Sequence, residues 1–412
     1  MLQYHFIKSY QLEKPEIMIT SKYIKLFVIN FFIIFLTYNI NAQTPPIVYV
    51  AGDGTGDYNC DGISDQVQIN QALDYVAANA GFTTVYLKGE FTYIIDEPIF
   101  LSSNTILTGD SNSVIKLKDS VGWNTQYKPL ISQKNHTGWD AWGVEGDSIS
   151  NVEIYGFKID GGNQAEPPGQ GYIALIHFRF PYNISIHNMH LQNSRWDIVR
   201  LSSSDLSSTH SNVFNNQIEY SGHEGICYVG LSNFEVYNNE IFHTRTNCGI
   251  RLKDCDTFDI HNNIIGNSLS KSPGGYAGIL IENQHSPHTG NTEVYENIIY
   301  GKNGGIHIGS QKDQATYPID SRKNVHIHHN KIFKTRDVDD GSGFVLDAGI
   351  KIGGFQNTII EHNVIEAGST DAIVYEGDLG GNSGYETTVR NNIIIDNGGY
   401  AINNKEPSVS TF

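Results

Sequence analysis

One short pattern of apolar and polar positions recurs along most of the chain. An apolar, often β-branched residue precedes one polar residue, then Asn-Asn or His-Asn follows, and an Ile comes shortly after. The last Asn of each copy falls at 188, 216, 239, 263, 297, 330, 363 and 392, in steps of 23 to 34 residues. A second short strand contains Gly-Ile, with the Gly at 225, 249, 278, 305 and 349. Short strands at this period, without a helical pattern, predict a solenoid of stacked strands.

Among solenoids, the pattern favours an all-β, single-stranded, right-handed parallel β-helix of about ten coils. The signature of leucine-rich repeats is absent, and propeller blades need about 40–50 residues each. Coils of a β-helix lie about 4.8 Å apart, so Asn side chains in register would form a hydrogen-bonded ladder. Asn also tolerates the left-handed backbone conformation of tight corners, and we expect the repeated Asn residues to adopt it.

The β-helix is expected to start near residue 47 and to carry a capping helix at that end. Residues 66–78 form the one good helical stretch, with Val67, Ile69, Leu73 and Val76 as its apolar positions. A helix there would cover strand edges that the end of a solenoid otherwise exposes. Short strands are expected to follow at 84–87, 93–95, 105–107 and 114–117.

Residues 1–42 are typical of an export signal with an extension at its start. Two lysines precede an apolar run at 26–36, which is too short to span a bilayer comfortably but suits a signal-peptide core. The small Ala42 suits the cleavage position, and the residues before Met18 have no signal character. We therefore expect a secreted, periplasmic or cell-surface β-helix domain of residues 43–412. The alternative is an uncleaved membrane anchor.

Composition narrows the class of partner. The chain has 27 Lys and Arg against 44 Asp and Glu, a net charge of −17 that disfavours non-specific binding to nucleic acid or anionic membrane. Hydrophobic residues make up 39% of the chain, enough to fill a large core. Four Cys residues form no C-x-x-C pair, so a zinc cage is not indicated, and any disulfide pairing stays open. We expect a monomer with no nucleic-acid partner and no stable membrane insertion after signal cleavage.

Basic residues collect on one face of the predicted strands. Alternation along residues 250–253 places Ile250 and Leu252 inside and Arg251 and Lys253 outside. A cationic stripe on an acidic protein suits a polyanion such as a uronic-acid polysaccharide, although scattered solvated charges would give a similar pattern. The same phase predicts an outward column of Arg200, Cys227, Leu280, His307 and Lys351, with His177 and Arg179 one coil earlier.

Carboxylates come just before these strands. Asp197, Glu224 with His223 beside it, and Asn247 occupy successive turns, and we place Asp160 at the matching turn one coil before Asp197. Two carboxylates at about 5–9.5 Å can split a glycosidic bond, one as acid and the other as base or nucleophile. His223 could tune a carboxylate or relay a proton. Each acid could equally be a turn cap or a surface charge.

Three further features suggest a ligand less strongly. Trp196 and Trp142 are candidate sugar-stacking platforms, with loop packing as the alternative. The segment 57–65 matches the first nine positions of a calcium loop, but position twelve is Gln68 instead of Glu, so we favour a turn. Calcium, on the oxygen ligands of this loop, is the one cofactor considered, and we expect none to be required. Those loop ligands would be Asp57, Asn59, Asp61 and Asp65.

The histidines near residue 328 lie in an Asn-ladder strand. No third-coil carboxylate is evident beside them in the sequence. We therefore interpret His326, His328 and His329 as structural.

The N-terminal motifs resemble the disaggregatase-related β-helix proteins. The resemblance rests on V-A-G-D-G-T-G-D-Y-N-C-D-G-I-S-D-Q-V-Q-I-N-Q-A-L at 50–73, T-T-V-Y-L-K-G at 83–89, S-N-T-I-L-T-G-D at 103–110 and I-K-L at 115–117, and extends over about 47–310. The family's namesake degrades an extracellular, chondroitin-like polysaccharide that contains uronic acid and N-acetylgalactosamine. The resemblance therefore implies an enzyme that cleaves a glycan.

A second resemblance, within the pectin-lyase-like superfamily, is to polygalacturonase-type hydrolases. S-G-H-E-G-I at 221–226 and N-C-G-I-R-L-K at 247–253 are similar to their G-H-G and R-I-K motifs. This resemblance implies that His223 supports catalysis and that Arg251 and Lys253 hold the substrate carboxylate. The family's paired Asp is here Trp196-Asp197, so one acid is missing.

Together these observations predict an exported glycoside hydrolase that acts on an anionic polysaccharide. A polysaccharide lyase that uses Lys253 or Arg251 as the base is the first alternative, and a non-catalytic glycan-binding or adhesion solenoid is the second. In the hydrolase, the expected roles are Asp197 as general acid, Glu224 or Asp160 as base or nucleophile, His223 as tuning residue, and Arg251, Lys253 and Arg200 as uronate ligands.

Overall fold

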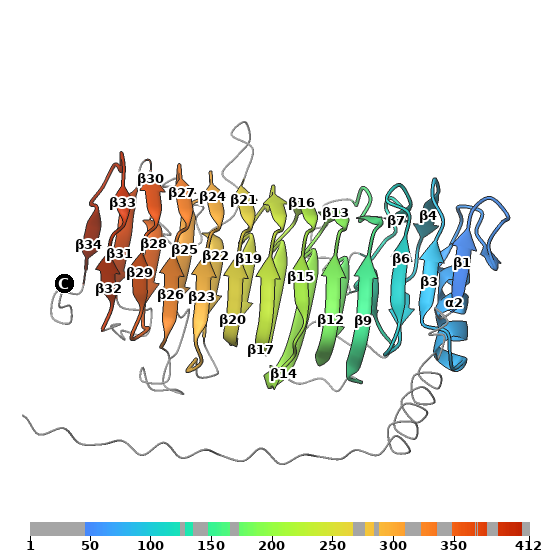
Figure 1. The fold of residues 1–412 in the computed structure, drawn as a ribbon. Coiled ribbons are helices and arrows are strands. Elements are labelled where there is room, and N and C mark those ends of the chain that lie inside the picture. Colours follow the sequence, from blue (N-terminus) through green and yellow to red (C-terminus); the bar gives the residue numbers. More distant parts are fainter. Residues whose placement is uncertain are drawn as a thin grey trace, which may run out of the picture. The chain divides into compact units, whose positions relative to one another are not determined.

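The computed structural model describes a stack of short parallel strands in residues 46–412, which form one compact unit. Figure 1 shows the strands side by side in sequence order, from β1 at the blue end to β34 at the red end. The predicted export signal lies outside the described residues. The described residues are 46–123, 128–134, 147–164, 173–266, 277–283, 288–309, 323–335, 348–366, 368, 370–376 and 386–405.

The strands run in three series, each made of in-register parallel pairs. The first series is β5 (Ile99–Leu101), β8 (Ile131–Gln133), β11 (Ile176–Arg179), β14 (Val199–Ser208), β17 (Ile226–Tyr237), β19 (Ile250–Lys253), β22 (Ala277–Glu282), β25 (Gly304–Gly309), β28 (Ala348–Gly353), β31 (Asp371–Glu376) and β34 (Ile402–Asn404). The second is β1 (Ile47–Ala51), β3 (Thr84–Leu87), β6 (Ile106–Gly109), β9 (Ile149–Tyr155), β12 (Pro181–His187), β15 (Asn212–Phe214), β20 (Asp256–His261), β23 (Thr292–Tyr295), β26 (Val325–His328), β29 (Ile359–Glu361) and β32 (Thr388–Arg390).

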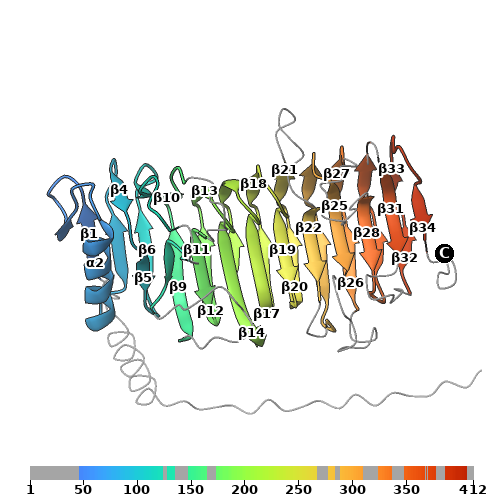
Figure 2. The ribbon, with the colours of Figure 1, turned by 180° about the vertical axis from the view of Figure 1, so that it is seen from behind.

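The third series forms a separate sheet of 11 strands, seen in part along the upper edge of Figure 2. The first two series merge into one 23-stranded sheet, because β17 pairs with β19 through its first half and with β20 through its second half. The third series is β4 (Thr92–Ile95), β7 (Val114–Leu117), β10 (Lys158–Asp160), β13 (His190–Ser194), β16 (Gln217–Ser221), β18 (Glu240–Phe242), β21 (Ile264–Gly266), β24 (Ile298–Tyr300), β27 (Lys331–Phe333), β30 (Val364–Glu366) and β33 (Ile393–Ile394). The predicted right-handed parallel β-helix is confirmed.

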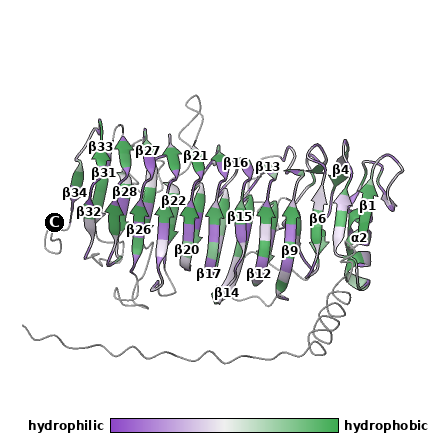
Figure 3. Ribbon diagram, in the orientation of Figure 1, coloured by the Kyte–Doolittle hydropathy of each residue, from purple (hydrophilic) through white to green (hydrophobic). Residues whose placement is uncertain are grey.

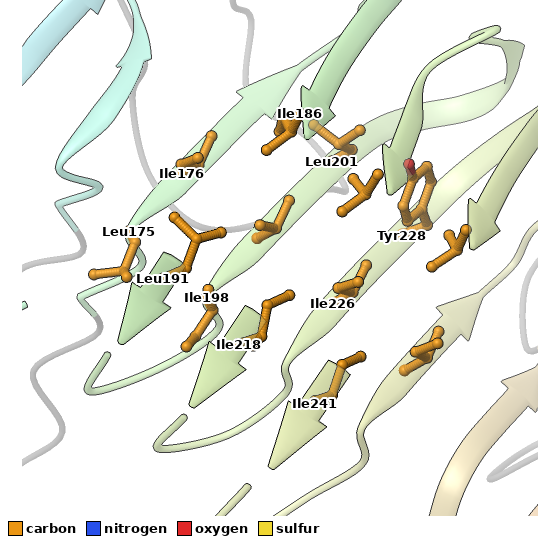
Figure 4. Close-up of a cluster of buried hydrophobic side chains, with 14 of the residues drawn as sticks. Leu175, Ile176, Ile186, Leu191, Ile198, Leu201, Ile218, Ile226, Tyr228 and Ile241 are labelled. Atoms are coloured by element: carbon orange, nitrogen blue, oxygen red, sulfur yellow. The ribbon is translucent and has the colours of Figure 1, made fainter. Parts of the chain in front are cut away.

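The core consists of columns of aliphatic side chains that repeat from coil to coil. In the third series one fully buried side chain stacks on the next, and Figure 4 shows Leu191, Ile218 and Ile241 from this column. Figure 3 shows hydrophilic and hydrophobic segments alternating along the strands, as period-two burial requires. The fully buried aliphatic residues of this column are Ile115, Ile159, Leu191, Ile218, Ile241, Ile265, Ile299, Ile332 and Ile365.

The repeated Asn residues form a ladder between the second and third series. The Nδ2 of Asn263 donates to the Oδ1 of Asn297 at 3.0 Å, and Asn297 donates in the same way to Asn330 at 3.0 Å. The same Oδ1 atoms also accept the backbone N–H of the preceding Asn, at 3.0 and 3.1 Å. These buried amides therefore tie each coil to the next. The ladder members are Asn216, Asn239, Asn263, Asn297, Asn330, Asn363 and Asn392.

The expected left-handed conformation belongs to the residue before each ladder Asn. Asn262 and His329 have φ values of 55°, and Glu296 has 54°, so this corner does not require Asn itself. Asn188 is one of these left-handed residues, with a φ of 53°. In its coil Met189 occupies the ladder position, where its N–H donates to Asn216 at 3.1 Å. The ladder positions were therefore misassigned in backbone conformation, and by one residue at 188, because Asn suits both the left-handed corner and the ladder position that follows it.

The Gly-Ile motif has a steric cause. A Cβ on Gly249 would overlap the Cγ2 of Ile265 on the third series and would lie 2.9 Å from the carbonyl oxygen of Gly278. Gly225 meets Ile241 in the same way, at 2.6 Å from its Cγ2. The corner between these series thus has no space for a side chain.

The helix α2 (Gln66–Ala78) lies at the blue end of the stack in Figures 1 and 2, where its buried Ile69, Leu73 and Val76 face the first coils. Its bounds match the predicted stretch, but Val67 is exposed. Within the described residues, no helix has the length and apolarity needed to cross a membrane.

Removing one ladder amide should destabilise the stack. Asn297→Ala leaves the N–H and Nδ2 of Asn263 and the carbonyl of Ile260 without their partner, so we expect a loss of about 2–4 kcal/mol in the free energy of unfolding. The measurement is denaturant unfolding followed by circular dichroism. Asn112→Ala, in an exposed turn, is the control and should change stability by less than about 0.5 kcal/mol. Equal losses in both variants would contradict a stabilising ladder.

Candidate active site

The predicted outward column exists in the register of the first strand series. His177 pairs with Arg200, Arg200 with Cys227, and Cys227 with Arg251. The column continues through Leu280 and His307 to Lys351. In β19, Ile250 and Leu252 are fully buried, whereas Arg251 and Lys253 are partly exposed, so the predicted alternation is confirmed.

Beside this column two acids share one histidine. His223 Nδ1 lies 3.0 Å from Asp197 Oδ1 and also contacts Glu224 Oε2. The backbone N–H of Glu224 donates to Asp197 Oδ1 at 3.2 Å. An oxygen of Asp197 and an oxygen of Glu224 lie within 4.8 Å of each other. The carboxylates meet because the residues before β14 and β17 occupy the same corner on adjacent coils.

Each acid is also paired with an arginine. Arg200 Nη1 donates to Asp197 Oδ2 at 2.8 Å, and Arg251 Nη1 donates to Glu224 Oε1 at 2.8 Å. Arg251 also binds Glu282, through Nε at 2.9 Å and through Nη2. Glu282 is fully buried, and its Oε2 has no hydrogen-bond partner within the described structure. The sequence analysis missed Glu282, although period-two alternation along residues 279–282 places it on the Arg251 face.

His223 is held as a neutral donor. Its Nε2 lies 3.0 Å from the Nδ2 of Asn247, which can only donate, so the ring proton belongs on Nδ1, toward the carboxylates. The ring stacks on Trp196 with centroids 3.9 Å apart. Burial, together with the positive charges of Arg251 and Arg200, lowers the pKa of His223 to about 4 against the opposing effect of Asp197.

Three carboxylates and two guanidinium groups thus meet at one buried point, next to an available lysine. Asp197, Glu224 and Glu282 are fully buried. Lys253, in contrast, is partly exposed, and no hydrogen bond or ion pair of its Nζ with another described residue is present. The partly exposed side chains at this surface are those of Lys253, Arg251, His223 and Trp196, and the acids beside them are buried.

Asp160 is not part of this cluster. It ends β10 in the third series, in register with Gln192, and its carboxylate accepts hydrogen bonds from Gly162, Gln192 and Asn193. Its suggested role as base is therefore not supported, because Asp160 lies in the third strand series, whereas Asp197 lies at the corner just before β14 of the first series.

The ends of the column also differ from the expected substrate surface. His177 is fully buried, with its Nε2 2.8 Å from Ser202 Oγ. Burial, together with the charge of Lys351, lowers the pKa of His307 to about 3, so this histidine is neutral at physiological pH. The positive charges of the column come from Arg200, Arg251 and Lys351.

Two buried residues support the site: Lys302, which sequence reasoning missed, and Cys227, which it placed in the outward column. Lys302 Nζ donates to Thr244 Oγ1 and lies 3.4 Å from the carbonyl oxygen of Asn247, and burial lowers its pKa to about 8. Cys227 lies between Arg200 and Arg251, and burial raises the pKa of its thiol to about 12, which excludes a thiolate at neutral pH. All four cysteines are free in this structure, and none of them forms a disulfide.

The calcium-like loop acts as a network of turns. Asp65 Oδ1 accepts the N–H groups of Asp61 and Gly62, and its Oδ2 accepts that of Ile94 at 2.7 Å. Asp57 Oδ2 accepts the N–H of Tyr49, Asn59 exchanges two hydrogen bonds with Gly56, and Asp61 accepts from Ile63. Two groups of described residues bring together three side chains of metal-binding type, and this loop is in neither. The turn interpretation fits the geometry better.

Trp142 lies outside the described residues.

Comparison with known proteins supports the right-handed β-helix fold, and three family models each match a part of the chain. Family models match residues 289–412 (Disaggregatase related), residues 182–319 (Right handed beta helix region) and residues 55–230 (Rhamnogalacturonase A/epimerase, pectate lyase-like). The predicted resemblance is confirmed, although the disaggregatase-related match covers the C-terminal part instead of residues 47–310. Among curated proteins none matches this chain.

Solved structures agree on the fold. The Dettilon tailspike protein has a TM-score of 0.64 at 15% identity, covering 89% of this chain and 70% of that chain. A mutant tailspike of E. coli bacteriophage HK620 has a TM-score of 0.63 at 15% identity, covering 85% of this chain and 66% of that one; related mutants were solved with a pentasaccharide and a hexasaccharide. PfbA, a surface adhesin of Streptococcus pneumoniae, has a TM-score of 0.52 at 17% identity, covering 83% and 89%.

The neutral state of His223 makes stability depend on pH. Between pH 6.5 and about 4 the unfolded chain binds a proton at this residue that the folded chain does not. The free energy of unfolding therefore decreases by at most about 3 kcal/mol as pH falls through this window. Denaturant unfolding at several pH values should show that His223→Gln loses less stability over this window than the wild type. His210→Gln, at an exposed histidine, should follow the wild type. Parallel curves for all three proteins would contradict this assignment.

Proposed function

We propose that this chain is an exported enzyme that cleaves an anionic, uronic-acid-containing polysaccharide by hydrolysis. The observation that carries the proposal is the cluster in which Asp197 and Glu224 share His223 beside Arg251. The pectate lyase-like match over residues 55–230 and the saccharide complexes of the HK620 tailspike support a carbohydrate substrate. The segment at 18–42 supports export.

The charge of the site favours a uronate. On a chain with a net charge of −17, Arg200, Arg251 and Lys253 gather within three adjacent coils. The two arginines are engaged by buried acids, so Lys253 is the cation most available to a substrate carboxylate. The carboxylate of a uronate bound there would neutralise the charge of Lys253, as Glu224 and Glu282 neutralise that of Arg251.

The spacing of the acids favours retention of configuration. Retaining glycosidases hold their carboxyl groups about 5–5.5 Å apart, and inverting ones about 6.5–9.5 Å apart. With oxygens within 4.8 Å, Asp197 would protonate the leaving oxygen and Glu224 would attack the anomeric carbon. Since both acids are fully buried, the reaction requires His223 and the Trp196 stacked on it to turn away from them when the glycan binds.

A lyase is the second candidate, and the same burial favours it. Lys253 is partly exposed, and its Nζ lacks a partner within the described structure, so it could remove the proton next to the uronate carboxyl group. In this reaction the acids would only orient Arg251. Elimination leaves an unsaturated uronate, whereas hydrolysis does not.

The deciding experiment screens the purified protein against a panel of uronate-containing glycans with two readouts. New reducing ends without ultraviolet absorbance would support hydrolysis, and both signals together would replace it with elimination. Binding on a glycan array without any cleavage would contradict an enzyme and favour a glycan-binding solenoid.

Removal of either acid should abolish hydrolysis. Asp197→Asn and Glu224→Gln are each expected to lower kcat by about 10²–10⁴-fold in a reducing-sugar assay, because each removes a proton-transfer or nucleophilic group. Glu240→Gln, on the exposed face of β18, is the matched control and should keep wild-type activity. Circular dichroism checks that each variant is folded. Full activity in both Asp197→Asn and Glu224→Gln would overturn the assignment.

Lys253→Ala distinguishes the two chemistries further. In a hydrolase it should raise KM for the uronate glycan about 10-fold or more with a smaller change in kcat, since the loss is mainly one of binding. In a lyase that uses Lys253 as base, kcat should collapse instead. Lys331→Ala, at an exposed position of β27, should change neither parameter.

A further inference from the structure

A second cluster lies on the second strand series and begins with Glu293, on the coil that also carries Glu282. Glu293 on β23 is in register with His326 on β26, and His328 lies two residues further along β26. Glu293 Oε2 is 2.8 Å from His326 Nδ1 and 3.0 Å from His328 Nε2. On the next coil, Glu361 Oε1 is 3.0 Å from His326 Nε2. The interpretation of these histidines as purely structural rested on a missing carboxylate, and it was wrong on that point: both neighbouring coils supply one.

A neutral His326 ring carries one N–H, so it can donate to only one of the two carboxylates that it contacts. Glu361 also accepts from Arg390 Nε at 2.5 Å, in an ion pair that involves its carboxylate form. A carboxylate can only accept, so the ring proton of His326 belongs on Nε2. Its Nδ1 lone pair then points at Glu293 Oε2, a contact that needs either a second proton or a cation.

His328 points a second nitrogen at the same oxygen. Its ring is stacked on Tyr295 with centroids 5.1 Å apart, which sets its orientation. One carboxylate oxygen thus faces two imidazole nitrogens, and the three atoms lie within 4.8 Å of one another.

We propose that Glu293, His326 and His328 bind a divalent metal ion of the first transition row. Zinc serves as the example for the geometry and for the test. Two imidazoles and one carboxylate suit such ions, while calcium and magnesium prefer oxygen ligands alone. Glu361 would act from the second shell of ligands, since it fixes which nitrogen of His326 carries the proton. The side chains of Glu293, His326 and His328 are 38%, 28% and 19% exposed, which leaves the fourth position to water.

Small movements would complete the geometry. Tetrahedral zinc with ligands at about 2.0–2.1 Å separates neighbouring ligand atoms by about 3.3 Å. The nitrogen–oxygen distances of 2.8 and 3.0 Å would therefore open by only about 0.3–0.5 Å.

Comparable groups elsewhere lack this combination. Asp197, His223 and Glu224 also bring three candidate ligands together, but Arg200 and Arg251 already neutralise their charges and would repel a cation. His187 lies in the same stacked aromatic column as His328, and its Nε2 is 2.9 Å from Glu153. That pair has one histidine, so it offers two ligands instead of three.

The test is metal binding by the purified, chelator-treated protein. Titration with Co²⁺ should give the visible absorption of a tetrahedral site at one ion per chain, and Zn²⁺ should displace it. His326→Ala or His328→Ala should abolish this signal, and Glu361→Gln should weaken Zn²⁺ binding about 10–100-fold. His187→Ala is the matched control and should bind like the wild type.

Three outcomes would overturn the proposal. These are no tetrahedral Co²⁺ signal in the wild type, an unchanged signal in both His326→Ala and His328→Ala, or equal loss in His187→Ala. Absence of binding would leave His326 as a doubly protonated bridge between Glu293 and Glu361. Circular dichroism of each variant separates loss of ligands from loss of the fold. The result does not depend on whether the protein cleaves a glycan.

Discussion

In-register stacking of coils is the constraint from which the rest of this structure follows. The buried amides of the Asn ladder bind each coil to the next through both a side-chain and a backbone hydrogen bond, as at Asn263, Asn297 and Asn330. Whatever one coil presents at a given position, the next coil presents at about 4.8 Å from it. Apolar positions therefore become continuous columns, and a corner without space for a Cβ becomes a column of Gly.

The same constraint governs charge. Two like charges at the same position of adjacent coils would repel at close range, and desolvation at a buried corner would add to the cost. The structure offsets acids with bases within and between coils: Asp197 with Arg200, and Glu224 and Glu282 with Arg251. Farther along, Glu293 faces His326 and Glu361 faces Arg390. Chemistry on this scaffold is thus built from several coils, and each cluster is a property of the stack.

The two clusters differ in a way that suits different ligands. Around Arg251 the acids are buried, the charges are paired, and a neutral His223 stacked on Trp196 lies at the surface. Around His326 the carboxylate of Glu293 is partly exposed and has two imidazoles, with no guanidinium among its ion-pair partners in the described structure. The first arrangement favours recognition of an anion, and the second favours a cation.

Periodicity alone was sufficient to predict the β-helix, the helix at 66–78 and the outward direction of Arg251 and Lys253, because these follow from local alternation. It also predicted that Asp197, His223 and Glu224 converge, because the repeats that carry them have nearly constant length. Lys302, the left-handed residue before each ladder Asn, and the removal of Asp160 from the site came only from the tertiary structure, which also showed that Glu282 binds Arg251. So did the pairing of Glu293 and Glu361 with His326, whose partners are 33 and 35 residues away along the chain. The physical reason is register: loops of unequal length separate the coils, so hydrogen bonding between coils, and not sequence spacing, decides which residues become neighbours and how deeply their charges are buried.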